Sequence, residues 1–250
     1  MIPADVALLV LAGVAGGVLS TVVSLASLVT YPALLGAGLS PLAANATNTV
    51  ALVSNAVGAA VGSRGELRGQ WGTVLRMAIL AGAGGAAGAA LLLALPPAAF
   101  ELVAPVLIGG SALLLLVQPQ LVARLGTSPR PGSPLLLLVA FAVSVYVGYF
   151  GAAGGVLMLA VLGMMFDRPL VQVNALKNML TGTANTVAAV GFVLFGPVHW
   201  ASLVPLACGF LVGGWTGPAI ARRLPGQGLR YIAGGSGLAL AFALAATTYS

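Results

Sequence analysis

One lysine and a group of asparagine and threonine side chains are the residues of this chain whose types could bind a ligand. Lys177 is the only charged residue well inside an apolar segment, and no carboxylate lies in such a segment to pair with it. Because a helix turns by about 100° per residue, Asn174, Lys177, Asn178, Thr181 and Asn185 fall within an arc of roughly 100°. An ammonium group beside amide and hydroxyl donors is typical of an anion site. The alternatives for Lys177 are a structural role or a side chain that reaches the membrane surface.

A second polar stripe lies in the first half of the chain. Asn45, Asn48 and Asn55 fall on one helix face, and Asn48-x6-Asn55 recurs as Asn178-x6-Asn185 130 residues later. Because buried polar groups need partners, the two stripes either line a substrate pocket or hydrogen-bond neighbouring helices. Their equivalent places in both halves favour the pocket.

Two glycine pairs suggest a second way to bind an anion. Gly16-Gly17 and Gly154-Gly155 each lie within a long apolar block. If the helix breaks at these pairs, unpaired backbone N–H groups at the new helix ends attract anions. The alternative is tight helix packing, because Gly13-x3-Gly17 also has small-x3-small spacing.

The candidate substrate-binding residues are therefore Lys177, Asn45, Asn48, Asn55, Asn174, Asn178, Thr181, Asn185, Gly16, Gly17, Gly154 and Gly155.

Composition places these residues in a membrane. The chain has 250 residues, of which 60% are hydrophobic and 6% are charged, whereas a soluble domain carries about 25% charged residues. The basic residues lie in short loops, where they act as topology signals and do not indicate nucleic acid. One histidine and four acidic residues leave little for acid–base or metal chemistry. We therefore expect no enzyme, no catalytic residues, no metal and no cofactor.

Apolar runs long enough to cross a bilayer, about 20 residues each, make up most of the chain. They cover residues 4–35, 42–62, 73–95, 98–118, 134–166, 169–195, 200–221 and 229–248. The blocks 4–35 and 134–166 are too long for one straight span and too short for two. A hairpin, a broken helix or a single tilted span would each fit.

The arginines in the loops favour the hairpin. Cytoplasmic loops carry an excess of basic residues. If Arg64 and Arg124 are cytoplasmic, Arg222 lies on the same side only when the block 134–166 enters and leaves by one face. We therefore expect a hairpin or two short spans in each long block, with both termini outside.

The chain also contains signs of a duplication. Trp71 matches Trp200, and Gly84-x3-Gly88 matches Gly213-x3-Gly217, both 129 residues apart. The predicted organisation is an N-terminal transmembrane repeat at 1–120, a connector at 121–133 and a C-terminal repeat at 134–250. The fold class is an all-α polytopic membrane protein with two homologous repeats, each holding a glycine-broken hairpin or short spans plus three transmembrane helices. An odd number of crossings in each repeat would invert one relative to the other, as in many transporters.

The segment Pro41-Leu42-Ala43-Ala44-Asn45-Ala46-Thr47-Asn48 has a counterpart in Val173-Asn174-Ala175-Leu176-Lys177-Asn178. With the glycine-rich block that precedes each, the chain resembles the TauE/SafE (TSUP) family of sulfite and sulfonate exporters over essentially its whole length. The resemblance implies export of sulfite, or of an organosulfonate such as sulfoacetate, across the bacterial inner (cytoplasmic) membrane.

The function expected from the residues and the resemblance together is secondary transport of a small sulfur-containing anion by alternating access between the two repeats. Acidic residues lie only at segment ends, so uniport or movement of a protonated anion fits better than a carboxylate relay. The expected partners are a small anionic substrate, the lipid bilayer and, as a possibility, further copies of the chain, without nucleic acid. The alternatives are an anion channel or a non-transporting membrane assembly protein.

Overall fold

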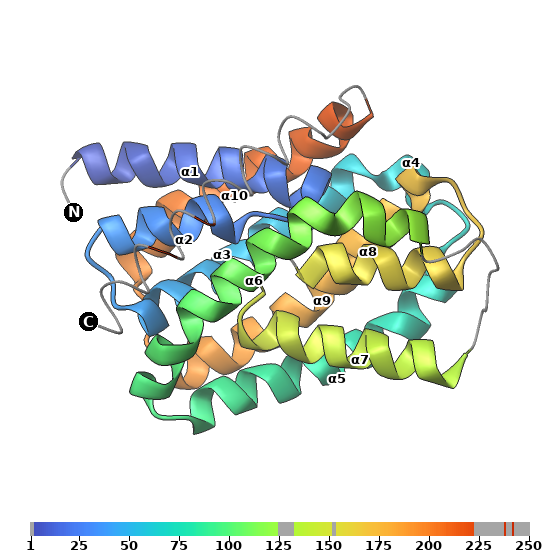
Figure 1. Cartoon of the computed structure of the whole chain (residues 1–250). Coiled ribbons are helices and arrows are strands. Elements are labelled where there is room, and N and C mark those ends of the chain that lie inside the picture. The colour runs from blue at the N-terminus through green and yellow to red at the C-terminus, as the bar shows by residue number, and fades with distance from the viewer. Residues whose placement is uncertain (1–2, 125–132, 152–153, 223–237, 239–241, 243–250) are drawn as a thin grey trace.

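The computed structural model describes residues 3–124, 133–151 and 154–222, and the single positions 238 and 242. Within these residues the chain forms ten helices (Figure 1). They are α1 (Pro3–Val23), α2 (Ser27–Gly36), α3 (Pro41–Gly62), α4 (Arg64–Leu67), α5 (Trp71–Ala94), α6 (Pro97–Arg124), α7 (Pro134–Tyr149), α8 (Gly154–Met165), α9 (Leu170–Phe195) and α10 (Trp200–Ala221). The described part contains no strand.

Prolines begin several of these helices. Pro41, Pro97 and Pro134 are the first residues of α3, α6 and α7, where a residue without an N–H loses no hydrogen bond and its fixed φ suits the helix. At α3 the preceding Ser40 also caps the helix, because its Oγ accepts from Ala43 N at 3.4 Å. These local signals explain why the predicted segment starts lie close to the observed ones.

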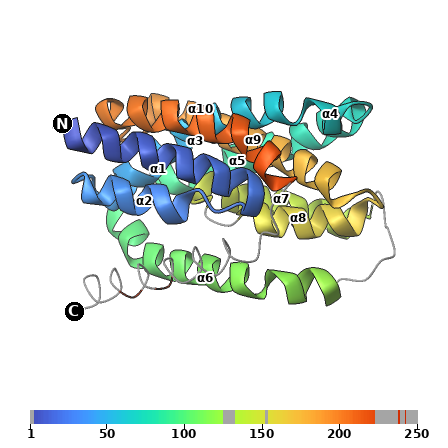
Figure 2. The ribbon, with the colours of Figure 1, turned by 90° about the horizontal axis from the view of Figure 1, so that it is seen from above.

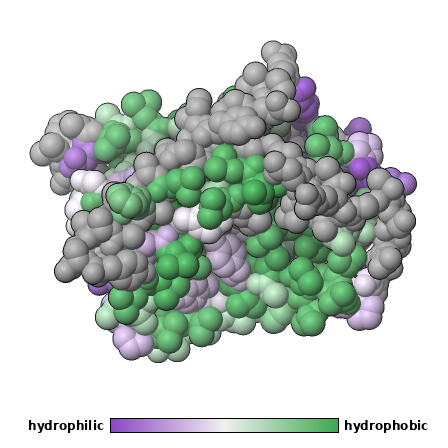
Figure 3. All heavy atoms as spheres, viewed as in Figure 1, coloured by the Kyte–Doolittle hydropathy of each residue, from purple (hydrophilic) through white to green (hydrophobic). Residues whose placement is uncertain are grey.

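The length and surface of the helices fit a bilayer. Four helices, α1, α5, α9 and α10, are long and apolar enough to cross a membrane. Large apolar side chains such as Leu75, Ile79 and Val106 are exposed on the outside, and hydrophobic residues cover much of the view in Figure 3. The protein is a multi-pass α-helical membrane protein, as the composition predicted.

Both long apolar blocks fold as hairpins of two helices. In the first, α1 ends at Val23 and α2 begins at Ser27. In the second, α7 ends at Tyr149 and α8 begins at Gly154. The 10 residues of α2 and the 12 of α8 span roughly 15–18 Å, about half of a hydrocarbon core of roughly 30 Å.

The structure corrects the predicted position of the first break. The second break comes directly before Gly154-Gly155, as expected, but Gly16 and Gly17 continue α1. A Cβ on Gly17 would lie 2.8 Å from Gly213 Cα in α10, so this glycine permits close packing of two helices. The chain turns instead at Ser24, whose φ of 65° is in the left-handed region.

The helices pair in a pattern that is the same when the two halves are exchanged. The first hairpin helix α1 packs on α10 of the second half, and α7 packs on α5 of the first half. The central helices α3 and α9 pack on each other, α3 also on α10 and α9 also on α5. Figure 2 shows α6 along the opposite side of the bundle from α10.

Corresponding helices run in opposite directions. The start of α10 meets the start of α3, because His199 N donates to Thr47 Oγ1 at 2.9 Å. The end of α10 meets the end of α3, because Arg222 Nη2 donates to the Gly62 carbonyl at 2.9 Å. Since α9 begins at that second end, where Gln172 contacts Gln70, α9 runs against α3 and α10 runs against α5.

Two predicted boundaries differ from the structure or lie outside it. Helix α6 continues to Arg124, so the helix extends four residues into the segment 121–133 that we expected to be a connector. The predicted last span, 229–248, lies outside the described residues except at 238 and 242.

Candidate functional site

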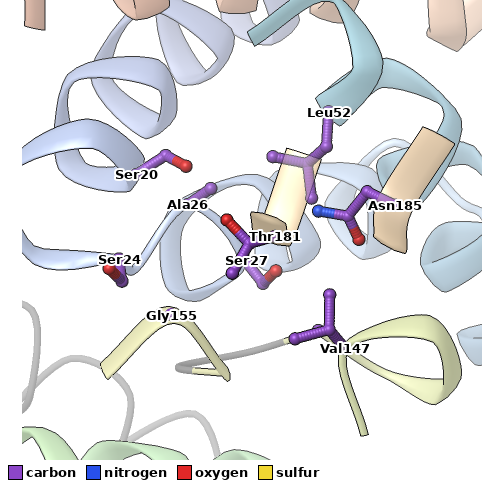
Figure 4. A pocket seen from close by; sticks show the side chains of 10 residues that line it. Ser20, Ser24, Ala26, Ser27, Leu52, Val147, Gly155, Thr181 and Asn185 are labelled. Atoms are coloured by element: carbon purple, nitrogen blue, oxygen red, sulfur yellow. The ribbon is translucent and has the colours of Figure 1, made fainter. Parts of the chain in front are cut away.

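The two breaks meet at one small cavity in the middle of the bundle (Figure 4). Its lining residues come from the breaks and from the central helices: Ser20, Ser24, Ala26, Ser27, Leu52, Val147, Gly151, Gly155, Thr181 and Asn185. The cavity volume is about 30 Å³, which holds about two water molecules. The first residues of α2 and α8 border it, so the positive ends of two helix dipoles lie beside it.

Lys177 lies next to this cavity and is buried, with 1% of its surface exposed. Its Nζ donates to Ser24 Oγ at 2.6 Å and to the Ser20 carbonyl at 3.3 Å. Both acceptors are uncharged, and no described carboxylate forms an ion pair with Lys177. A buried cation without a counter-charge is costly, and an anion bound beside Lys177 would offset that cost.

Ser24 and Gly155 hold Lys177 against the first break. A Cβ on Gly155 would lie 2.6 Å from Ser24 Oγ and 3.3 Å from Lys177 Cδ. Glycine is therefore needed at the start of α8 for the two hairpin breaks to approach each other. The left-handed Ser24 is the only described non-glycine residue with a positive φ, and such strain often accompanies a functional position.

Asn45 and Asn174 bond to backbone rather than to the cavity. Asn45 Nδ2 donates to the Tyr149 carbonyl at 3.0 Å, and Asn174 Nδ2 donates to the Thr21 carbonyl at 2.9 Å. Both carbonyls belong to the last turn of a hairpin helix, where the helix itself supplies no donor. These two asparagines therefore stabilise the two breaks in the same way.

Asn48 and Asn55 support serines that line the cavity. Asn48 Nδ2 donates to Ser27 Oγ at 3.1 Å, and its Oδ1 accepts from Thr30 Oγ1 at 2.6 Å. Asn55 Nδ2 donates to Ser20 Oγ at 2.9 Å. The stripe on α3 thus acts through serines of the first hairpin.

Thr181 and Asn185 of α9 line the cavity directly. Thr181 Oγ1 donates to the Lys177 carbonyl at 3.0 Å, which leaves its oxygen able to accept and fixes the direction of its proton. Asn185 Oδ1 is buried without a hydrogen-bond partner, and Figure 4 shows its amide nitrogen turned toward the cavity. Asn178 has a buried Nδ2 with no partner and is not among the lining residues.

The four candidate glycines divide between the cavity and the packing of helices. Gly155 lines the cavity. Gly154 begins α8 and packs on the Val147 side chain. Gly16 packs on Thr30, with a Cβ position 2.6 Å from Thr30 Cγ2, and Gly17 packs on α10. Neither Gly16 nor Gly17 is among the lining residues.

Sequence reasoning missed the serines of the first hairpin. Ser20, Ser24 and Ser27 are spaced by four and three residues within the apolar block, which is helical spacing on one face. That spacing was an available signal. Leu52 and Val147, which also line the cavity, are indistinguishable in the sequence from other apolar residues.

The chemistry that the cavity offers is binding by hydrogen bonds and one nearby positive charge. Its lining residues carry hydroxyl and amide groups and no charged group. Among the described residues no cluster of three His, Cys, Asp or Glu could hold a metal ion. The arrangement suits an oxyanion, whose oxygens accept from hydroxyl, amide and ammonium donors.

Comparison with known proteins gives one match. A family model described as "Sulfite exporter TauE/SafE" matches residues 9–244. No curated protein and no solved structure matches the chain. The match includes every candidate site residue, the first hairpin from residue 9 onward and the whole second hairpin.

Proposed function

This chain belongs to the sulfite exporter TauE/SafE family, and from that premise we propose that it exports sulfite or an organosulfonate such as sulfoacetate. The family is one of membrane transporters and not of enzymes. The proposal adds the substrate, the direction and the site to this membership. It places the protein in the bacterial inner membrane with both termini outside, in keeping with the positive-inside rule.

One observation carries the proposal. Two half-membrane helices start at a polar cavity, and the buried Lys177 donates to two residues that line it. Half-helix N-termini that point at an anion, at mid-membrane between two repeats, are a recurring arrangement in secondary transporters. The substrate would bind at this cavity, with its oxygens toward Lys177, Ser24 and Ser27.

Alternating access is the transport mechanism that fits this geometry. A cavity of about 30 Å³ has room for about two waters, so a sulfur oxyanion needs the hairpins to separate. The interchangeable packing of α1 on α10 and α7 on α5 supports two homologous, inverted repeats that exchange conformations. The residues 1–120 and 134–250 would then be the two moving units.

The proposal is tested by flux in proteoliposomes. Purified protein is reconstituted, and the uptake of sulfite, sulfoacetate, taurine, sulfate and chloride is measured with the wild type and with Lys177→Ala. We expect saturable flux of a sulfur anion in the wild type and at least a tenfold loss in Lys177→Ala. The control is Arg76→Ala, which removes a positive charge from an exposed position of α5 and should keep the flux.

Three outcomes would contradict parts of the proposal. No flux of any sulfur anion by a folded protein would remove the transport function. Flux that does not saturate and far exceeds a transporter's turnover would favour an anion channel. Unchanged flux in a folded Lys177→Ala protein would remove Lys177 from the site.

A further inference from the structure

We propose that this site selects its substrate by charge and accepts a monoanion, hydrogen sulfite or a sulfonate without a second charged group, rather than a dianion such as sulfite, sulfate or sulfoacetate. The inference rests on the proposed function and narrows its two candidate substrates to sulfite, carried as hydrogen sulfite. It names Lys177 as the residue that sets this charge.

The count of charges at the cavity carries the inference. Among the residues that the structure describes, Lys177 is the only charged one that hydrogen-bonds to residues lining the cavity, and the lining residues are all neutral. The four acidic residues of the whole chain are Asp5, Glu66, Glu101 and Asp167, and none of them lines the cavity. A monoanion therefore forms a neutral pair with Lys177, whereas a dianion leaves one negative charge buried without a partner, which is unfavourable at low dielectric.

The remaining donors do not replace a second cation. The hydroxyl groups of Ser20, Ser24 and Ser27 and the amide of Asn185 are dipoles without net charge. The N-terminal ends of α2 and α8 add partial positive charge, yet a helix end contributes far less than the desolvation penalty of a full buried charge. The donors thus hold the oxygens of the anion, and Lys177 balances its charge.

Lys177 also has one N–H donor left for the anion. An ammonium group donates three hydrogen bonds, and the described residues accept two of them, at Ser24 Oγ and the Ser20 carbonyl. An oxygen of the anion can take the third. Because Ser24 lies at the break of the first hairpin, the anion then joins Lys177 of α9 to that break.

Few other titratable groups belong to the helices around Lys177. Besides Lys177 itself, the described charged and titratable groups are Asp5 on α1, Tyr31 on α2, Arg64 and Glu66 on α4, Arg76 on α5, and Tyr146 and Tyr149 on α7. None of them lines the cavity. The protein is the same for every anion. A change of the apparent KM with pH that is seen for one substrate and not for another therefore reports the protonation of that substrate.

The test compares anions of fixed and variable charge in proteoliposomes of the full chain. Initial rates give the apparent KM for methanesulfonate, which is always a monoanion, for sulfate, which is a dianion, and for total sulfite. The pH is varied across the range in which hydrogen sulfite loses its proton. Protein-free liposomes give the leak that is subtracted.

We expect the apparent KM for total sulfite to rise at least tenfold more than that for methanesulfonate as the pH rises, because only sulfite changes its own charge. Sulfate should bind at least tenfold more weakly than methanesulfonate. Lys177→Gln should weaken the binding of methanesulfonate at least tenfold. Lys177→Arg, which keeps the charge, should retain the preference for the monoanion. Lys177→Arg also keeps the test decisive where Lys177→Gln does not fold.

Three results would overturn the inference. An apparent KM for sulfate equal to that for methanesulfonate would show that the site does not select its substrate by charge. An apparent KM for total sulfite that is independent of pH would show the same. A parallel rise of KM for sulfite and methanesulfonate would assign the titration to the protein. In these cases transport itself persists, whereas the absence of any saturable flux would overturn the proposed function together with the inference.

Discussion

At the scale of single residues, the site depends on contacts that only small side chains allow. Ser24 Oγ accepts from Lys177 at 2.6 Å, and Gly155 lies directly against Ser24. The asparagines bond to the backbone and serines of the hairpins, and Asn45 and Asn174 do so at equivalent positions. Most of the polar stripes therefore position the serines and the two breaks, whereas Thr181 and Asn185 line the cavity and Lys177 lies beside it.

The contact between Gly155 and Ser24 gives a prediction at this scale. Gly155→Ala places a methyl group 2.6 Å from Ser24 Oγ, so Ser24 must move and its bond with Lys177 lengthens. We expect at least a tenfold loss of sulfur-anion flux and a loss of stability of about 1–3 kcal/mol. Flux and unfolding in detergent with denaturant measure the two effects.

The control for that change is Gly163→Ala on the same helix. A Cβ at Gly163 meets nothing within 4 Å, and alanine favours the helix by about 1 kcal/mol. This variant should keep its flux and be as stable as the wild type or more stable. Equal flux in Gly155→Ala and Gly163→Ala would show that the contact with Ser24 has no role in transport.

At the scale of helices, rows of closely packed glycines, here called glycine seams, join each hairpin to the opposite half of the molecule. Gly13 and Gly17 of α1 face Gly209 and Gly213 of α10, with the Cβ position of Gly13 2.9 Å from Gly209 Cα. On the other side Gly88 of α5 faces α7. Lipid provides little hydrophobic force between helices, so close backbone contact supplies the attraction.

A prediction for these seams uses Gly213. A Cβ there would overlap the Val14 carbonyl oxygen, and a backbone atom cannot move aside as a flexible side chain can. We expect Gly213→Ala to destabilise the protein by at least about 1–3 kcal/mol, seen as a lower midpoint of unfolding in denaturant. The control is Gly110→Ala on α6, which should be neutral or stabilising because the new methyl group meets nothing within 4 Å. Equal unfolding midpoints for the two variants would show that close packing at Gly213 does not stabilise the protein.

At the scale of the whole molecule, polar groups tie the two halves together at one end of the bundle. Arg222 Nε at the end of α10 donates to Glu66 Oε1 of α4 at 2.8 Å. Arg168, just before α9, donates to Gln70, whose Nε2 donates to the Glu66 carbonyl at 2.6 Å. This end is the one where α3 ends and α9 begins, so the ties hold the two halves together in this conformation.

The ion pair makes stability depend on pH. The hydrogen bond from Arg222 lowers the pKa of the Glu66 carboxyl below its ordinary value. The ion pair therefore stabilises the fold fully above the pKa that Glu66 has in the unfolded chain. This stabilisation is lost as the pH falls through the lower pKa that Glu66 has in the folded protein. We expect Glu66→Gln to cost up to about 1 kcal/mol at neutral pH, and the difference from wild type to vanish in acid.

Denaturant unfolding of both proteins over a range of pH checks this prediction. Raising the salt concentration should reduce the difference at neutral pH, because salt screens an exposed pair. A difference between the two proteins that stays constant into acid would show that the carboxylate charge contributes nothing.

The sequence by itself determined the class of the protein and the position of most helices. An 8-segment pattern of apolar runs with prolines at segment starts encodes helix boundaries locally, through the lost N–H and the fixed φ of proline. The excess of apolar residues requires a bilayer, whatever the packing. The lysine in an apolar run predicts an anion site, since a charge there needs a partner, and that site stays a prediction until flux is measured.

Only the tertiary structure decided how the residues meet. Gly16-Gly17 and Gly154-Gly155 look alike in the sequence, yet one pair packs inside α1 and the other begins α8. The difference depends on whether another helix or another break lies opposite, which is a long-range fact. For the same reason the serines of the first hairpin became recognisable as site residues only once Lys177, 153 residues from Ser24 in the chain, lay against them.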